Sequence, residues 1–406
     1  MKILHTSDWH IGRTFHGHNT LEALSSVLEV MVQEVRVREI DVVIVAGDVF
    51  DSATPAAACY PVLAGALSRL REAGAQIVVT SGNHDSAARL GFLAEFTAGA
   101  GIHIVTDPAS VGRPIQIDDA HGPVLFYGIP YLEPAMVRAQ WPGVVLRTQE
   151  QTITHAMSLV RSDLAERRGA EPGVRAVAIS HCFAAGIEPS AGVERDIQSG
   201  GIDVVPLSAF DGPDYVALGH IHGRAELTPR VRYSGAPLFY SFSEQHKARG
   251  AWLVELDAAG LADVSWMPLP IPRALVTLTG TLDELLERED FAQHRDDWVC
   301  AVLTDAAAPI DPMRKLQARF PWCATLMLRP AGGENADGLD YGQRVRAATS
   351  DTGLVGAVLQ HVRAGEGLSN DEKCSSSTSP QRRSREGAPP RNRRVWAISS
   401  PSDCRL

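Results

Sequence analysis

The sequence contains no run of about 18 apolar residues, the length that a transmembrane helix needs. The first residues, MKILHTSDWHIG, place Asp8 where a secretory signal peptide would need its apolar segment. The six cysteines are scattered along the chain and form no CxxC pair. We therefore expect a reduced, cytoplasmic protein that is neither secreted nor embedded in a membrane.

The sequence also has fewer basic than acidic residues: 38 Lys and Arg against 48 Asp and Glu, which gives a formal net charge of −10. This balance argues weakly against a nucleic-acid substrate. Phosphate binding depends on a local basic face rather than on the sum over the molecule. A metal site also gathers carboxylates that bound cations then neutralise. The net charge therefore leaves DNA open as a substrate.

The first two thirds of the chain alternate apolar runs with helical patterns. Helices are predicted over residues 19–38, 55–71 and 86–96, the first capped by Asn19 or Thr20. After His181 the pattern changes to strands and loops. This order favours an α/β sandwich with crossover connections. The predicted buried strands are MKILHTSD, DVVIVAGD, AQIVVTSG, VLFYGIPY, RAVAISH and DYVALGH. The later strands and loops are VRYSGAPL, GAWLVELD and ADVSWMPL.

A proline-marked joint at residues 267–273 precedes a second, smaller unit. The segments ALVTLTG, TLDELLERED, WVCAVLTD, DPMRKLQARF and ATLMLRP predict a β-α-β-α-β unit, with Thr281 capping its first helix. A Gly/Asp-rich linker over 331–341 and a short amphipathic helix over 354–363 follow. The predicted divisions are 1–270, 271–330, 331–373 and 374–406.

The last segment, 374–406, is rich in Ser and Pro and carries seven arginines against Glu386 and Asp403. It shows no apolar period, so we expect it to be disordered. The change of character falls inside a helix-start signal, which favours a frameshifted reading of a GC-rich gene. The alternative is a functional basic tail that binds DNA.

Five short polar blocks follow predicted strands, where functional groups converge in open α/β sheets. Their carboxylate, amide and imidazole groups are ligands for divalent cations. Residues two apart on an extended chain point the same way, so Asp8 with His10, and His220 with His222, can each grip one ion. The blocks are Asp8-Trp9-His10, Gly47-Asp48-Val49-Phe50-Asp51, Gly82-Asn83-His84-Asp85, Ser180-His181 and Gly219-His220-Ile221-His222.

Each block alone has a plainer explanation as a turn, a loop cap or a surface polar pair. The five together, in order and each after a buried-strand pattern, predict a metal centre. The glycines before Asp48, Asn83 and His220 suit tight turns that bring the backbone close to the ions.

With these blocks the chain resembles the calcineurin-like metallophosphoesterases, and among them the SbcD-type nuclease subunits. The segments that carry the resemblance are ILHTSDWHIGRTFHG, VIVAGDVFDSATP, SGNHDSAARL, DYVALGHIH and VRYSGAPLFYSF. The likeness covers about residues 1–373 and is strongest before residue 245. It implies an α/β fold, a two-sheet metallophosphoesterase sandwich with a small α+β capping domain.

The resemblance also implies a ligand set for two divalent ions, most often Mn²⁺. Asp48 would bridge the ions, and His84 would be a catalytic histidine that is not a ligand. Asp51 would orient a ligand histidine, and His5, His16 and His18 would be structural or lie at the substrate's edge. The first ion would be held by Asp8, His10, Asp48 and His222, and the second by Asp48, Asn83, His181 and His220.

The implied function is that of a DNA nuclease in repair, recombination and replication, a double-strand exonuclease and a single-strand or hairpin endonuclease. Its partners would be DNA, a coiled-coil ATPase of the SbcC type and a second copy of the chain, in a heterotetramer. Two alternatives stay open, a metallophosphatase or nucleotide phosphodiesterase of the same fold and a non-catalytic scaffold. In the capping unit, the basic residues expected to contact phosphates are Arg273, Arg288, Arg295, Arg314, Lys315 and Arg319.

Overall fold

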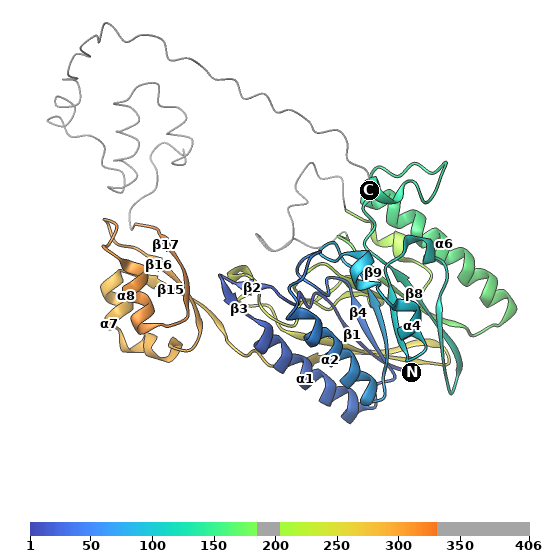
Figure 1. Ribbon diagram of the computed structural model, residues 1–406, viewed down its shortest axis with the longest axis horizontal. Helices are drawn as coiled ribbons and strands as arrows, with labels where there is room; N and C mark the ends of the chain where they lie inside the picture. Colours follow the sequence, from blue (N-terminus) through green and yellow to red (C-terminus); the bar gives the residue numbers. More distant parts are fainter. Residues whose placement is uncertain (185–203, 331–406) are drawn as a thin grey trace, which may run out of the picture. The chain divides into compact units, whose positions relative to one another are not determined.

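A computed structural model of the chain describes residues 1–184 and 204–330 (Figure 1). Two six-stranded sheets form the main body of the described residues. The first sheet has the order β14 (Gly260–Pro268), β13 (Gly250–Asp257), β1 (Lys2–Thr6), β4 (Val42–Ala46), β5 (Gln76–Thr80) and β6 (Ile102–Val105). The second has the order β11 (Ala225–Glu226), β12 (Val231–Tyr233), β10 (Tyr215–Gly219), β9 (Arg175–His181), β8 (Gly122–Ile129) and β7 (Ile115–Asp119).

Parallel pairing dominates the centre of each sheet. Strands β1, β4, β5 and β6 run parallel, as do β8, β9, β10 and β12. The hairpin β13–β14 adds to the first sheet antiparallel to β1, and β7 and β11 are antiparallel edges of the second sheet. The carboxyl ends of β1, β4 and β5 therefore share one edge, and those of β9 and β10 share another.

The central strands are buried on both faces, as their continuous apolar runs predict. In β4, Val42 and Ile44 pack with Val177 and Ile179 of β9 in a core between the sheets. Val43 and Val45 point the other way, into a core that the strand shares with the helices. Because side chains alternate across a strand, one apolar run fills two cores. This arrangement confirms the two-sheet sandwich.

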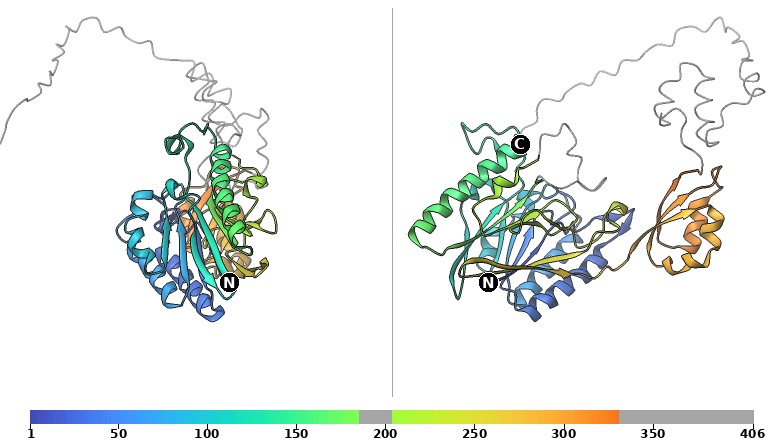
Figure 2. Two further views of the ribbon diagram at one scale, coloured as in Figure 1. Left: turned by 90° about the vertical axis from the view of Figure 1, so that its right-hand side faces the viewer. Right: turned by 180° about the vertical axis from the view of Figure 1, so that it is seen from behind.

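Helices cover the outer faces of both sheets (Figure 2). Helices α1 (Leu21–Arg38) and α2 (Cys59–Glu72) pack on the first sheet. Helix α6 (Gln149–Ala170) packs on the second, and the sequence prediction did not include it. Its signal was present, because Ile153, Met157 and Val160 repeat at helical spacing behind an N-cap at Thr148.

The helix predicted over 86–96 is wrong as a single element. It is divided into α3 (Ala87–Leu90) and α4 (Ala94–Ala98). Gly91 ends the first piece, and Leu93 lies in the left-handed region with φ 64°, which a continuous helix does not allow. Helix α2 begins four residues later than predicted, at Cys59.

A third sheet of three parallel strands belongs to the smaller predicted unit. It has its own core, which includes Leu285, Val299 and Phe320. Thr281 caps α7 in a capping box with Glu284, as predicted from the sequence. The β-α-β-α-β order is confirmed as β15 (Leu275–Gly280), α7 (Leu282–Glu287), β16 (Trp298–Leu303), α8 (Pro312–Arg319) and β17 (Cys323–Leu328).

Residues 1–304 and 309–329 form one compact unit, so the division at residue 270 stays a prediction. The linker over 331–341, the helix over 354–363 and the tail over 374–406 lie outside the described residues. None of the helices in 1–184 and 204–330 has both the length and the apolar composition of a membrane span. The remaining short elements are β2 (Thr14–Phe15), β3 (His18–Asn19), η1 (Pro108–Ser110), α5 (Pro134–Val137), η2 (Leu207–Phe210), η3 (Phe242–Glu244) and η4 (Glu289–His294).

Candidate metal centre

The five polar blocks lie at the carboxyl ends of neighbouring strands, as the sequence predicts. Three of them follow β1, β4 and β5 in the first sheet, and two end β9 and β10 in the second. The facing sheets bring the ends together, so that Asp48 Oδ2 lies 3.6 Å from His10 Nε2 and 3.2 Å from His181 Nε2. All seven predicted ligand residues therefore gather at one place.

Several of these residues have a strained backbone. Asp8, His10, Asp48 and His220 have φ values of 54°, 44°, 46° and 103°, in the range that side chains other than glycine rarely adopt. Such conformations cost on the order of 1–3 kcal/mol each and persist where the surrounding structure enforces them. Strain at four of seven clustered polar residues marks this as a functional site.

The glycines that precede ligand residues leave room for ligand side chains that come from other loops. A Cβ at Gly82 would lie 2.1 Å from Asp48 Oδ1, and one at Gly47 would lie 2.2 Å from His181 Nδ1. At Gly219 it would lie 1.7 Å from the carbonyl oxygen of Ala46. The glycines thus allow strand ends of the two sheets to approach each other closely.

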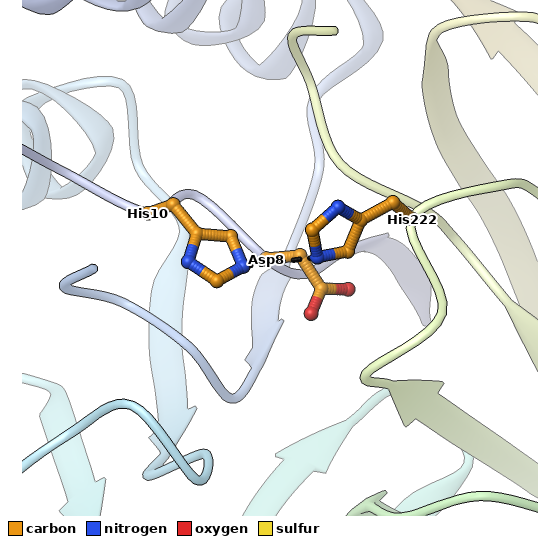
Figure 3. Close-up of side chains that lie close together, drawn as sticks. All are labelled: Asp8, His10 and His222. Carbon is orange, nitrogen blue, oxygen red and sulfur yellow. Dashed lines mark hydrogen bonds between the residues drawn. The ribbon is translucent and has the colours of Figure 1, made fainter. Parts of the chain in front are cut away.

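Asp8, His10 and His222 form the first of two candidate ion positions (Figure 3). Their ligand atoms lie within 4.8 Å of one another, and all three residues are buried. The ring nitrogens Nε2 of His10 and His222 are 3.0 Å apart. Together with Asp48, these residues make up what we call the first position.

Asp48, His181 and His220 form the second candidate position, again with ligand atoms within 4.8 Å. Asn83 completes it, because its Oδ1 lies 3.0 Å from His181 Nε2 and 3.1 Å from His220 Nδ1. Asp48 belongs to both positions, which suits a carboxylate with two acceptor oxygens. The second position is defined by Asp48, Asn83, His181 and His220.

The carboxylates next to the two rings of the first position indicate that its donor set fits a cation. The Nδ1 atoms of His10 and His222 each lie 3.2 Å from a carboxylate oxygen, of Asp51 and Glu244 respectively, which can only accept. With the proton on Nδ1 of each ring, beside its carboxylate, the two Nε2 atoms would face each other as lone pairs. Two lone pairs at 3.0 Å repel unless a positive charge lies between them.

Burial also favours the neutral form of three ligand histidines, which is the form that binds metals. It lowers the pKa of His10 and His222, and it lowers the pKa of His220 to about 3. Burial would raise the pKa of Asp48, but His181 and His10 hold that pKa well below its usual range. Neutral imidazoles beside an ionised carboxylate match a divalent cation.

Among the seven ligand residues, the pKa values of Asp8 and His181 are raised rather than lowered. Burial raises the pKa of Asp8 to about 7. Burial lowers the pKa of His181, but the charge of Asp48 and its hydrogen bond raise it to about 9.

A surrounding layer of groups holds the ligands in place. Asp51 Oδ1 lies 3.2 Å from His10 Nδ1 and 3.2 Å from Arg13 Nη1, and its orienting role stays a prediction. Asp85 accepts the backbone N–H groups of Val49, Phe50 and Gly82 and so joins two ligand loops. Sequence analysis missed Glu244, which contacts His222, because no motif marks the segment SFSEQHK.

His84 lies beside both positions. Its Nδ1 donates to the carbonyl oxygen of Asp51 at 2.8 Å, which leaves Nε2 free to act on a substrate. Its backbone N–H donates to Asp48 Oδ1 at 2.8 Å. The ring is half-buried and meets the His10 ring edge-on at 4.8 Å. Its geometry suits the non-ligand role, although its ring also lies within ligand distance of His10 and Asp48.

The other predicted histidines have structural surroundings. His5 is buried and bonded to Tyr215 Oη and to the carbonyl oxygen of Leu218. The ring of His16 packs on Phe15, and that of His18 packs on Trp298. Whether any of the three also lies at the substrate's edge stays a prediction.

A cleft of about 1030 Å³ opens beside the second position. Asn83 and His220 form part of its wall, together with Tyr131, Gln149 and Phe183. The ligands Asp8, His10 and His222 are at most 2% exposed. The second position therefore adjoins the space that a substrate can enter.

Most of the basic residues predicted to contact phosphates have partners within the small unit. Arg273 stacks 3.7 Å over the ring of Trp322, and Arg288 and Arg314 pair with Asp290 and Asp311. Arg319 donates to the carbonyl oxygens of Leu286 and Arg288. The phosphate contacts of this unit stay a prediction.

Comparison with known families identifies the protein family that contains this metal centre. Residues 1–224, more than half of the chain, match the calcineurin-like phosphoesterase family. The chain belongs to that family. It is a metal-dependent phosphoesterase that uses divalent ions, and the predicted fold is confirmed. Residues 271–352 match a second family, SbcD_C, described as the type 5 capsule protein repressor C-terminal domain.

Similar solved structures share little sequence with this chain. The TT1561 protein of Thermus thermophilus is 16% identical, with 65% of this chain and 98% of that one covered and a TM-score of 0.37. A dimetal phosphatase from Danio rerio is 13% identical, with 66% and 99% covered and a TM-score of 0.39.

Replacing Gly82 by alanine should disrupt the centre. The new Cβ would lie 2.1 Å from Asp48 Oδ1 and 2.3 Å from the Asp48 backbone nitrogen, so the shared ligand must move. We expect weaker Mn²⁺ binding in a calorimetric titration. Gly169→Ala is the control, because no atom within 4 Å of the new Cβ opposes it in α6. The control should bind metal normally and gain about 0.5–1 kcal/mol of helix stability. Equal Mn²⁺ affinity in both variants would contradict the packing argument.

Proposed function

We propose that this phosphoesterase is a DNA nuclease, the catalytic subunit of an SbcCD-type complex. One observation carries the proposal: a centre built for two ions shares its chain with a match to the SbcD_C family. The expected activities are exonuclease action on double-stranded ends and endonuclease action on single strands or hairpins. A hydrolase for small phosphoesters has no evident use for such a second unit.

In this proposal the seven ligand residues hold two ions, most often Mn²⁺, at the first and second positions. When bound, a pair of divalent ions polarises a phosphodiester and lowers the pKa of the attacking water. Asp48 would link the two positions, because its Oδ2 lies 3.6 Å from His10 Nε2 and 3.2 Å from His181 Nε2. Asp51 and Glu244 fix the rings of His10 and His222, so that little reorganisation is needed during the reaction.

His84 is proposed to act on the phosphoryl group or on the leaving oxygen. The carbonyl oxygen of Asp51 holds its Nδ1–H, so the ring can present only Nε2 to the substrate. Protonated at Nε2, the ring donates a hydrogen bond to negative charge that develops in the transition state.

A hairpin-ended DNA duplex tests the proposed activity. With Mn²⁺ present, the wild-type chain should open the hairpin and degrade the duplex, and excess EDTA should stop both reactions. Asp8→Ala removes a carboxylate of the first position and should lower cleavage to the EDTA level, while circular dichroism stays that of a folded chain. Rapid hydrolysis of a small phosphodiester with no cleavage of DNA would instead favour the metallophosphatase alternative.

Substitution of His84 by glutamine should separate chemistry from metal binding. We expect a turnover about 10²–10⁴-fold lower with two ions still bound per chain, because the lost group is an acid–base and not a ligand. Turnover on DNA and elemental analysis of the same preparation check this. A variant that has lost an ion would make His84 a ligand.

A second copy of the chain is the proposed partner of an exposed apolar patch. Phe92, Leu93 and Phe96, at 72%, 49% and 79% exposure, lie within five residues at α3 and α4. Monomeric proteins seldom leave such a cluster open to water. The coiled-coil ATPase partner would bind within 331–373, outside the described residues.

The double variant Phe92→Ser with Phe96→Ser should convert a dimer into a monomer. Light scattering after size exclusion measures the mass, with Val37→Ser as the control, because Val37 is 77% exposed on α1, outside the patch. A wild-type chain that is monomeric at high concentration, or a double variant that stays dimeric, would rule out this patch as the interface.

A further inference from the structure

Glu244 is fully buried at the end of η3 and holds three groups at once. Its Oε1 accepts the Nδ1–H of His222 at 3.2 Å. Its Oε2 accepts the backbone N–H of Tyr240 at 3.1 Å and lies 3.3 Å from Nη2 of Arg249. The carboxylate is therefore fixed by two contacts besides the one to the ligand histidine.

Arg249 braces the same histidine from the backbone side. Its Nη1 donates to the carbonyl oxygens of His222 at 2.6 Å, Ala236 at 3.1 Å and Leu238 at 3.3 Å. Arg249 is 3% exposed, so its charge needs the compensating charge of Glu244. The pair thus grips both the ring and the main chain of His222.

The other ligand histidines are held differently. The partner of His10 is Asp51, whose side chain is 31% exposed and shared with Arg13. The partner of His181 Nδ1 is the neutral carbonyl oxygen of Ala46 at 3.0 Å. Nε2 of His220 has no hydrogen-bond partner among the described residues. In the part of the chain described, only His222 is backed by a fully buried ion pair.

We propose that Glu244 is a positioning residue for the first metal position, acting through His222. By accepting the Nδ1–H it fixes the tautomer, aims Nε2 at Nε2 of His10, and makes the ring a stronger donor to the cation. The proposal rests on the ligand assignment made above. It predicts that Glu244 controls the affinity of the first position and leaves the second unchanged.

Stepwise Mn²⁺ binding to the full-length metal-free chain, followed by calorimetry, separates the two positions. Asp8→Ala identifies the step that belongs to the first position, and Asn83→Ala identifies the step of the second. Glu244→Gln should weaken the Asp8-dependent step about 10- to 100-fold, the usual effect of losing such a support. The Asn83-dependent step should stay within about twofold of the wild-type value, because Glu244 touches no ligand of the second position.

Asp119→Asn is the matched control for a general loss of stability. Asp119 pairs with the buried Arg175 at 2.6 Å in the second sheet and contacts no ligand residue. This control should lower the melting temperature with both Mn²⁺ steps unchanged. If Glu244→Gln does not fold because Arg249 loses its counter-charge, Glu244→Gln with Arg249→Met removes both charges and takes its place.

The outcomes distinguish this proposal from the one on which it rests. A wild-type chain that binds no Mn²⁺ would overturn the ligand assignment and the positioning role with it. A wild-type chain that binds two ions, with a Glu244→Gln variant that loses stability but binds both normally, would overturn the positioning role alone. Equal weakening of both steps would do the same.

Discussion

The close approach of two ring nitrogens, Nε2 of His10 and Nε2 of His222 at 3.0 Å, is the constraint on which this centre depends. The other ring nitrogen, Nδ1, of each histidine lies 3.2 Å from a carboxylate oxygen, which favours the proton on Nδ1 and a lone pair on Nε2. The fold therefore holds like acceptors together against their repulsion. A cation between the two rings would relieve that repulsion.

The register of neighbouring strands places the ligand residues of each sheet next to one another at the strand ends. Thr6 of β1 is opposite Val45 of β4, and Ala46 is opposite Thr80 of β5, so the loops after these strands begin within two residues of one another. In the second sheet, Gly219 is opposite His181. Because both faces of these strands are buried, a register shift of one residue would exchange the two cores. Core packing thus determines the metal geometry.

The sequence predicted the ligands because their types and their place after apolar strands are local signals. It did not predict Glu244, because the contact with His222 spans 22 residues and arises from how η3 folds back on the site. The missed helix α6 is a different case, since its apolar spacing was visible around Ile153 and Met157. The split after Gly91 depended on the left-handed backbone of Leu93, which no apolar pattern reveals.

The two ion positions differ in what surrounds them. Asp8, His10 and His222 are almost completely buried, and both histidines of the first position have carboxylates behind them. The second position has one amide ligand, Asn83, and opens through Asn83 and His220 to the cleft. A phosphate entering by that cleft meets the second position before the first. Asn83 and His220 would therefore hold their ion next to the substrate's path, whereas Asp8, His10 and His222 would hold theirs deeper in the protein.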